Sequence, residues 1–225
     1  IAPDSPDFSG FIFKIQANMN PAHRDRIAFM RVCSGVFESG MEVWHSQGEK
    51  TIRLTQPLAF MADERKSVEV AYPGDIIGLF DTGIFHLGDT LCTGQKIKYA
   101  GIPLFAPENF MRVAALDSLK RKQFVKGISQ LAQEGAIQTF KYPDTGLEDY
   151  IVGAVGVLQF DVLLYRLKGE YGVDAKTETL PFRFVRWIVK SPCEPDALRL
   201  ISSTRHGVDR SGRRVLLFEN EWSID

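Results

Sequence analysis

Residues 10–100 carry strand signals almost without a break, and this feature constrains the fold more than any other. Short segments rich in aliphatic and aromatic residues, such as GFIFKIQA and RIAFMRVCSG, are bounded by Gly, Pro, Asn or Asp, and no segment there keeps a helical period over three turns. The pairs Gly74-Asp75 and Gly88-Asp89 fall where strands must reverse. Six or seven short strands at this spacing predict a closed antiparallel β-barrel, because closure removes exposed strand edges.

The pattern changes after Pro103 to an alternation of strands and helices. A strand-like segment at 109–116 precedes Asp117-Ser118, which can cap a helix that ends at Gly135. The strands AIQTFKY and DYIVGAVG flank a turn at 143–146, and the helix VLQFDVLLYRLKGEYG and a last strand around LPFRFVRWIV follow. This β-α-β-β-α-β order predicts a ferredoxin-like domain. The apolar face of the first helix is expected to comprise Phe124, Val125, Ile128, Leu131 and Ala132.

The chain is long enough for two domains, and its fold class is predicted as mixed β and α+β. Residues 1–9 are rich in proline and are interpreted as a linker from a missing domain. Residues 10–102 are expected to form the β-barrel domain. Residues 103–225 are expected to form the ferredoxin-like domain and a C-terminal extension, with a short helix at PDALRLI and a hairpin turn at 209–212.

Composition restricts the possible partners and the compartment. The formal net charge is −1, so any contact with nucleic acid must come from a local basic patch. The three cysteines share no CxxC spacing, which favours a reducing, cytosolic compartment over a disulfide framework or a zinc site. No apolar stretch approaches the length of about 18 residues that spans a bilayer. We therefore expect a cytoplasmic protein with no membrane partner.

Catalytic signatures are absent from the sequence. It contains no GxxxxGK[ST] phosphate loop, no GxSxG elbow and no HExxH metal motif. The glycines in GAVG at 153–156 lack the third glycine of a dinucleotide fingerprint and are better explained by close packing of a strand on a helix. Cys33 lies inside a strand and is expected to be a buried structural thiol. We expect no catalytic, cofactor-binding or metal-binding residue in this segment.

Basic residues gather in several places along the sequence. Two interpretations are open: they form a phosphate-facing rim on a rigid scaffold, or they are ordinary solubilising charges. His23, Arg24 and Arg26 share one loop with Asp25. The other groups are Lys50 with Arg53; Arg65 with Lys66; Lys120, Arg121, Lys122 and Lys126 near the start of the first predicted helix; and Arg210, Arg213 and Arg214 around the last turn.

The segment FKIQANMNPAHRDRIAFMRVCSG at 13–35, followed by GMEVWH, closely resembles the second domain of the bacterial class II peptide chain release factors, a family of translational GTPases. The resemblance covers about residues 8–225, through AYPGDIIGLFD, FAPENF, LAQEGAIQTF and VGAVGVLQFDVLLYRLKGEYGVDA. Parts of it are shared with elongation factor G, but QANMNPAHRDR is specific to the release factors. A fragment of an elongation-factor-like or ribosome-protection factor, and a stand-alone RNA or protein interaction module, are the alternatives.

The resemblance implies a barrel of the elongation-factor domain-two type and a role on the ribosome. Such factors use GTP to promote the departure of class I release factors after peptide release. GTP and magnesium would bind in a domain missing here, so the segment itself would not be an enzyme. The barrel would contact small-subunit ribosomal RNA, and the next domain would lie near a small-subunit protein.

The same resemblance suggests roles for the basic groups. His23, Arg24, Asp25 and Arg26 would contact the missing GTPase domain and transmit its nucleotide state, or would face RNA phosphates; we favour the first for Arg24 and Arg26. The residues expected to contact RNA or the ribosome are Lys50, Arg53, Arg65, Lys66, Lys120 and Arg121.

Overall fold

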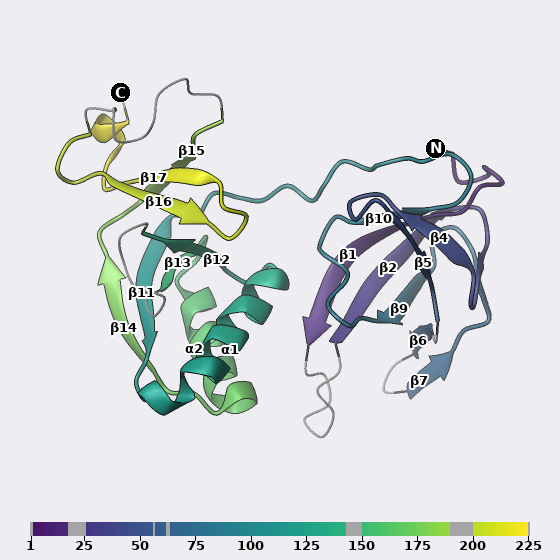
Figure 1. Ribbon diagram of the computed structural model, residues 1–225, viewed down its shortest axis with the longest axis horizontal. Coiled ribbons are helices and arrows are strands. Elements are labelled where there is room, and N and C mark those ends of the chain that lie inside the picture. The colour runs from purple at the N-terminus through teal and green to yellow at the C-terminus, as the bar shows by residue number, and fades with distance from the viewer. Residues whose placement is uncertain are drawn as a thin grey trace. The chain divides into compact units, whose positions relative to one another are not determined.

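The computed structural model describes residues 2–17, 26–55, 57–61, 64–142, 150–189 and 200–224. The chain forms two compact units, Ile1–Pro103 and Leu104–Asp225, each with its own core (Figure 1). Each unit is described by itself below.

Unit 1 is all-β. Eight of its strands form one antiparallel sheet in the order β5-β4-β10-β1-β2-β9-β6-β7, and β3 pairs with β8 separately. The strands are β1 (Ser9–Ala17), β2 (Arg26–Ser34), β3 (Phe37–Glu38), β4 (Glu42–His45), β5 (Lys50–Arg53), β6 (Leu58–Met61), β7 (Glu64–Ser67), β8 (Val70–Ala71), β9 (Ile76–Phe80) and β10 (Thr90–Cys92).

The sheet of unit 1 curls around a single apolar core into a half-barrel. The register of β1 against β2 shifts twice, between Ser9 and Gly10 and between Ile12 and Lys14, and such irregularities bend a strand. The reversals predicted from the glycines are confirmed, since Gly74 and Gly88 adopt φ values of 102° and 87°. The all-β, barrel-type domain predicted from strand spacing is therefore confirmed, but the predicted closure is wrong, since β5 and β7 end the order of the described strands without pairing with each other. Its core includes Phe8, Ile12, Ile15, Met30, Val32, Phe37, Ile77, Leu79 and Leu91.

Unit 2 follows the β-α-β-β-α-β order, which confirms the ferredoxin-like prediction. Its central strands lie in the order β14-β11-β13-β12, and β16, β17 and β15 extend the same sheet beyond β12. The elements are β11 (Asn109–Ala115), η1 (Ser118–Lys120), α1 (Arg121–Gln133), β12 (Gln138–Lys141), β13 (Tyr150–Ala154), α2 (Leu158–Tyr171), β14 (Ala175–Leu180), β15 (Phe184–Trp187), β16 (Arg205–Asp209), β17 (Arg214–Phe218) and η3 (Glu221–Ser223).

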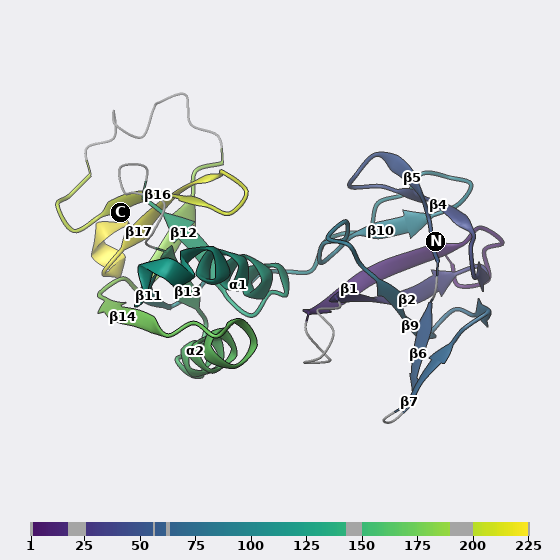
Figure 2. The same cartoon turned by 60° about the horizontal axis from the view of Figure 1, so that its bottom comes forward.

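Two apolar cores lie on opposite faces of the sheet in unit 2. Helices α1 and α2 cover one face, where Phe124, Ile128 and Leu131 of α1 meet Phe160 and Leu167 of α2 (Figure 2). Val125 and Ala132 are half-buried beside them, so the predicted apolar face of α1 is confirmed. The other core lies on the opposite face and joins side chains of β11, β12 and β13 to side chains of β15 and β17. It contains Phe110, Phe140, Ile151, Phe182, Val185, Val215 and Leu217.

The position of the fourth and last strand of the β-α-β-β-α-β order was predicted wrongly. We expected it around LPFRFVRWIV, but β14 is Ala175–Leu180 and pairs with β11 along its whole length. Strand β14 is an edge strand whose sequence, AKTETL, is mostly exposed and therefore lacks an apolar signal. The apolar segment forms β15 instead, which pairs with β17. The predicted turn at 143–146 and most of the predicted helix PDALRLI lie outside the described residues.

Candidate functional site

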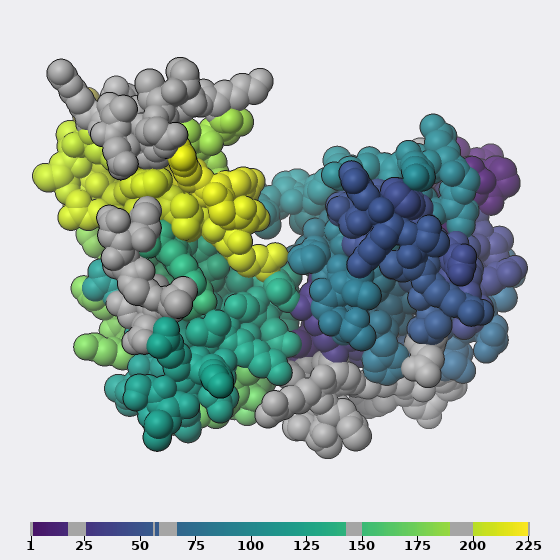
Figure 3. Space-filling model, viewed as in Figure 1, coloured from purple at the N-terminus to yellow at the C-terminus, as the bar shows by residue number. Residues whose placement is uncertain are grey.

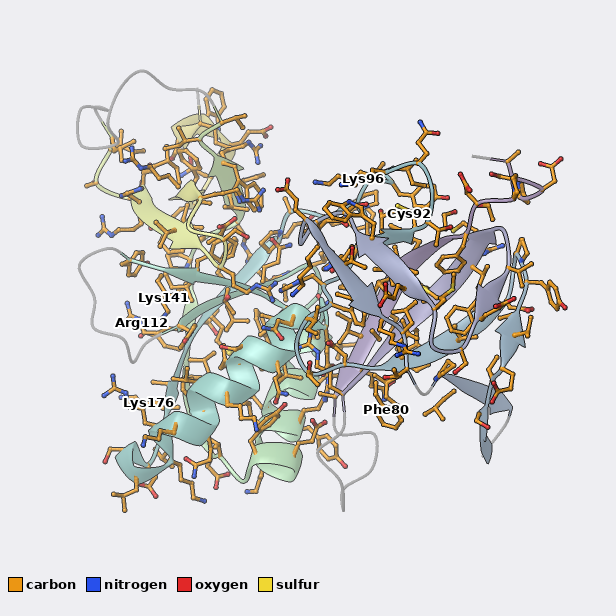
Figure 4. The ribbon with its side chains drawn as sticks, turned by 45° about the vertical axis from the view of Figure 1, so that its right-hand side comes forward. Phe80, Cys92, Lys96, Arg112, Lys141 and Lys176 are labelled. Atoms are coloured by element: carbon orange, nitrogen blue, oxygen red, sulfur yellow. The ribbon has the colours of Figure 1, made fainter. Side chains whose placement is uncertain are left out.

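Trp44 and Lys96 form a cation–π pair on the surface of unit 1. The Lys96 ammonium lies 3.4 Å from the centroid of the Trp44 ring, and Trp44 is half-buried on β4 between Thr51 of β5 and Cys92 of β10. Figure 4 shows Lys96 near the strand that carries Cys92. An exposed cation–π pair contributes about 0.5–1 kcal/mol. The pair therefore holds an aromatic ring and a positive charge together where a partner can reach them.

The segment that carries Lys96 is fixed to the sheet by hydrogen bonds. The Ser46 hydroxyl donates to the carbonyl oxygen of Ile97 at 2.5 Å, and the backbone N–H of Tyr99 donates to Thr90 Oγ1 at 3.0 Å. Lys98 is exposed between these two anchored residues. The lysines consequently extend from a backbone that is tied to β4 and β10.

Of the cations predicted to contact RNA, Lys50 and Arg53 lie on β5, the edge strand beside β4. Lys50 is exposed and pairs in register with His45. Arg53 is also exposed, but its Nε donates to the carbonyl oxygen of Gly40 at 2.8 Å and so ties β5 to the turn before β4. We refer to Trp44, Arg53, Lys96 and Lys98 together as the Trp44 surface, from which Lys50 is left out because its partner His45 faces the buried side of the sheet.

Arg26 is directed into unit 1. Its Nε donates to Asp81 Oδ2 at 2.6 Å and its terminal nitrogen donates to the carbonyl oxygen of Phe85 at 2.8 Å. Asp81 Oδ1 in turn accepts the backbone N–H groups of Gly83, Ile84 and Phe85. Because the Arg26 side chain is 10% exposed and the Asp81 side chain 0%, this is an internal ion pair. His23, Arg24 and Asp25 lie outside the described residues.

The remaining predicted contact residues do not belong to the strands and the segment that form the Trp44 surface. Arg65 and Lys66 lie on β7, at the opposite end of the sheet order from β5. Lys120 belongs to unit 2, where its ammonium donates to the carbonyl oxygen of Gly172 at 2.6 Å. Gly172 ends α2, so Lys120 satisfies a C-terminal carbonyl of that helix. Arg121 is the first residue of α1.

Sequence reasoning missed Trp44, Lys96 and Lys98. Trp44 follows the buried Val43 and precedes the buried His45, so the alternation along β4 already indicated that the tryptophan faces outward. Nothing local indicated that Lys96, which follows β10, would lie over that ring. A fixed hydrogen-bond network beneath this surface was also not predicted: His45 Nε2 and Asp89 Oδ2 lie 2.8 Å apart, both buried, and Asp89 accepts the N–H of His86.

The described thiols do not suggest a nucleophile. Cys33 is half-buried, less than predicted, and burial raises the pKa of its thiol above the usual value. A raised pKa keeps the thiol protonated and unreactive at neutral pH. Among the residues that the structure describes, no group of three or more His, Cys, Asp and Glu side chains is placed to hold a metal ion.

Family models match both units. Residues 99–225 match the model described as "Class II release factor RF3, C-terminal domain", and residues 7–94 match the model described as "Elongation factor G domain 2". The second match includes Trp44 and Arg53 of the Trp44 surface and ends before Lys96 and Lys98.

Whole-chain relatives share about half of the residues. The chain is 53% identical over 226 residues to peptide chain release factor 3 of Symbiobacterium thermophilum, 50% identical over 228 residues to that of Listeria welshimeri, and 48% identical over 223 residues to that of Nostoc punctiforme. These alignments cover 99–100% of this chain but 41–42% of the relatives. The chain thus spans about two fifths of the length of the curated relatives it matches.

A solved structure supports the fold. A crystal structure of a protein from Thermus thermophilus superposes with a TM-score of 0.64 at 18% identity, covering 92% of this chain and 30% of that chain. At this identity the likeness concerns the fold alone. None of the described helices is both long enough and apolar enough to cross a membrane.

Proposed function

This chain belongs to the class II release factor family, and from that premise we propose that it is the ribosome-binding part of a translation termination factor. The observation that carries the proposal is the Trp44 surface, a rigid aromatic ring with lysines around it on the unit that matches domain 2 of elongation factor G. The proposed partner of this surface is small-subunit ribosomal RNA.

The chemistry of the Trp44 surface suits RNA. Ammonium groups neutralise phosphates, and an indole face is open to stacking by a base or a ribose once the ammonium above it has moved to a phosphate. Because Lys96 already lies over the ring, RNA that approaches the tryptophan meets a positive charge within one contact distance. Lys98 adds a further exposed charge on the segment that carries Lys96. The fixed backbone of 96–99 limits the entropy lost when RNA binds.

The full-length factor would use GTP and magnesium in a domain outside this chain. In the proposed cycle, the nucleotide state of that domain changes how the factor engages the ribosome, and the class I release factor departs after peptide release. This chain would supply ribosome contacts, with unit 2 near a small-subunit protein, and would hydrolyse no GTP. The proposed site of action is the cytoplasm.

The segment that carries His23, Arg24 and Asp25 is proposed to contact the GTP-binding domain. Support comes from Arg26, the first residue of β2, which directly follows that segment in the chain. Its internal ion pair with Asp81 anchors the start of β2. Arg26 itself would act as the anchor and the other three residues as the contact. Lys50, Arg65, Lys66 and Arg121 do not belong to the Trp44 surface. They remain proposed ribosome contacts.

The proposal is tested by co-sedimentation of the chain with small ribosomal subunits over a series of KCl concentrations. The double variant Lys96→Ala with Lys98→Ala should bind more weakly and should lower the slope of log K against log salt by about 1–2. The double variant Lys122→Ala with Lys126→Ala, which removes two exposed cations from α1, is the control for net charge. A double variant that binds with the slope of the unmodified chain would overturn the assignment of the Trp44 surface to RNA.

A further inference from the structure

The turn between β16 and β17 is held rigidly by one carboxylate. Asp209 Oδ1 accepts the backbone N–H groups of Ser211 and Arg213, each at 2.9 Å. The backbone closes the same turn: Asp209 N–H donates to the Arg213 carbonyl oxygen, and Gly212 N–H to the Asp209 carbonyl oxygen, both at 2.9 Å. Gly212 supplies the positive φ of 76° that the turn needs. The hairpin turn predicted at 209–212 is thus confirmed, and it has a single defined shape.

Arg213 is held in place on this turn by two side chains. Its Nε donates to Asp209 Oδ2 at 2.7 Å, and its guanidinium carbon lies 5.7 Å from the centroid of the Trp187 ring. The Trp187 indole N–H donates to the same Asp209 oxygen at 2.9 Å, and the Trp187 ring packs against Phe140 of the core. The guanidinium is therefore oriented by groups that are themselves anchored in unit 2.

Although it is held in place, Arg213 remains accessible. Its side chain is 59% exposed, whereas the Asp209 side chain is 8% exposed. The two terminal nitrogens of Arg213 donate no hydrogen bond to a residue that the structure describes, which leaves one edge of the guanidinium facing solvent. A planar donor edge presented in this way matches two oxygens of a phosphate.

Positive charge is concentrated around this turn. The segment RHGVDRSGRR at 205–214 holds four arginines and one aspartate, in a chain whose net charge is −1. All four arginines are exposed. The Asp209 carboxylate and the positive φ of Gly212 shape the turn. Figure 3 shows the yellow atoms of β16 and β17 on the surface of unit 2.

The surface of the turn also indicates the class of partner. Every residue from 210 to 214 is exposed, and all are arginine, serine or glycine. Protein interfaces usually bury an apolar centre, whereas nucleic-acid interfaces are polar, wet and strongly positive. We refer to residues 209–214 together with Trp187 as the arginine turn.

We propose that the arginine turn binds the sugar–phosphate backbone of RNA and gives unit 2 an RNA contact of its own. This inference rests on the proposed function for the identity of the RNA, which would be ribosomal. Arg213 supplies a preoriented fork to one phosphate, and Arg210 and Arg214 add charge on either side of it. Trp187 and Asp209 act as positioning residues, because they orient Arg213 and are not themselves expected to contact RNA.

The test measures binding of the chain to a fluorescein-labelled 16-base-pair RNA duplex of arbitrary sequence by fluorescence anisotropy, from 50 to 300 mM KCl. Arg213→Ala should weaken binding by about five-fold or more at 100 mM KCl and lower the salt slope by about 1. Arg213→Lys keeps the charge but loses the planar donor fork. The affinity of this variant should therefore fall between those of the unmodified chain and Arg213→Ala. Arg210→Ala, which leaves the Asp209 bonds in place, provides a second variant.

Lys122→Ala is the matched control, because it removes one exposed charge from α1. If Arg213→Ala and Arg210→Ala weaken binding no more than Lys122→Ala does, the duplex senses net charge only and the arginine turn is not its site. If polyglutamate displaces the duplex with the same dependence on Arg213, at equal charge concentration, the partner is an acidic protein and the proposal fails. The Lys96→Ala, Lys98→Ala double variant, measured in parallel, separates failure of the Trp44 surface from failure of the arginine turn.

Discussion

Arg26 Nε lies 2.6 Å from Asp81 Oδ2, so the first residue of β2 is tied to the residue that follows β9. The pair is almost fully buried, and Asp81 accepts three further backbone N–H groups from the loop that it begins. An arginine that looks from the sequence like part of an exposed basic loop is therefore a structural element of the barrel.

Removing one partner of this pair should destabilise unit 1 strongly. Arg26→Ala leaves the Asp81 carboxylate buried without its counter-charge, and breaking such a pair costs about 3–5 kcal/mol. Urea unfolding followed by circular dichroism measures the loss. The control is Arg31→Ala on the same strand, where the side chain is exposed and the change should stay within about 0.5 kcal/mol. Equal unfolding midpoints for the two variants would show that the ion pair contributes nothing.

Phe160 tests the packing of α2 in unit 2. It is 5% exposed in the core beneath the helices, so Phe160→Ala should lower the free energy of unfolding by about 3–5 kcal/mol. Tyr165→Ala on the same helix is the matched control, because Tyr165 is 80% exposed and loses little packing. A thermal shift of the same size in both variants would contradict the burial of Phe160.

Lys120 is predicted to stabilise unit 2. Its bond to the carbonyl oxygen of Gly172 joins the turn before α1 to the end of α2, and a charge-assisted bond of this kind at an exposed site contributes roughly 0.5–1.5 kcal/mol. Lys120→Ala should therefore lower the melting temperature of unit 2 more than Lys122→Ala does. In the salt-series co-sedimentation, the two variants should behave alike. A selective loss of ribosome binding in Lys120→Ala would instead restore its role as a contact residue.

Asp209 makes the arginine turn sensitive to acid. Burial opposes its ionisation, but hydrogen bonds from Trp187 and Arg213 outweigh that effect and lower the pKa of the carboxyl below its ordinary value. A lowered pKa in the folded state means that the ionised group stabilises the fold above the unfolded pKa of about 3.9, and that this stabilisation is lost as pH falls through the lower folded pKa.

The measurement compares unmodified chain and Asp209→Asn by urea unfolding between pH 2 and pH 6. The unmodified chain should be the more stable of the two at pH 6, and the difference should shrink as pH drops below about 4. A difference that stays constant over the whole range would mean that ionisation of Asp209 is not coupled to folding.

Local periodicity explains what could be predicted from the sequence. Strand spacing, the 3.6-residue repeat through Phe124 and Ile128, and the glycines at reversals are encoded by neighbours in the chain, and they led to both domain types. Strand β14 was missed because its edge position leaves AKTETL without an apolar face. We therefore assigned this strand to the next apolar segment, LPFRFVRWIV.

The contacts that define the candidate site are long-range and have no local signature. Lys96, which follows β10, meets Trp44 of the neighbouring strand β4, and Arg26 of β2 meets Asp81, which follows the neighbouring strand β9; neither pairing follows from the residues beside it in the chain. The basic residues themselves were visible from the sequence. Which of them are structural, as Arg26 and Lys120 are, depends on partners that the fold brings from elsewhere.

The pairing of Ser9 with Cys92 has a consequence for how the chain is made. During synthesis, β1 emerges early and can pair with β2, but its other edge stays open until β10 has been translated. Nearly the whole of unit 1 must therefore leave the exit tunnel before its sheet is complete. Until then the open edge of β1 is a place where two nascent chains on neighbouring ribosomes can join, so the half-made barrel is the stage at which a chaperone would matter most.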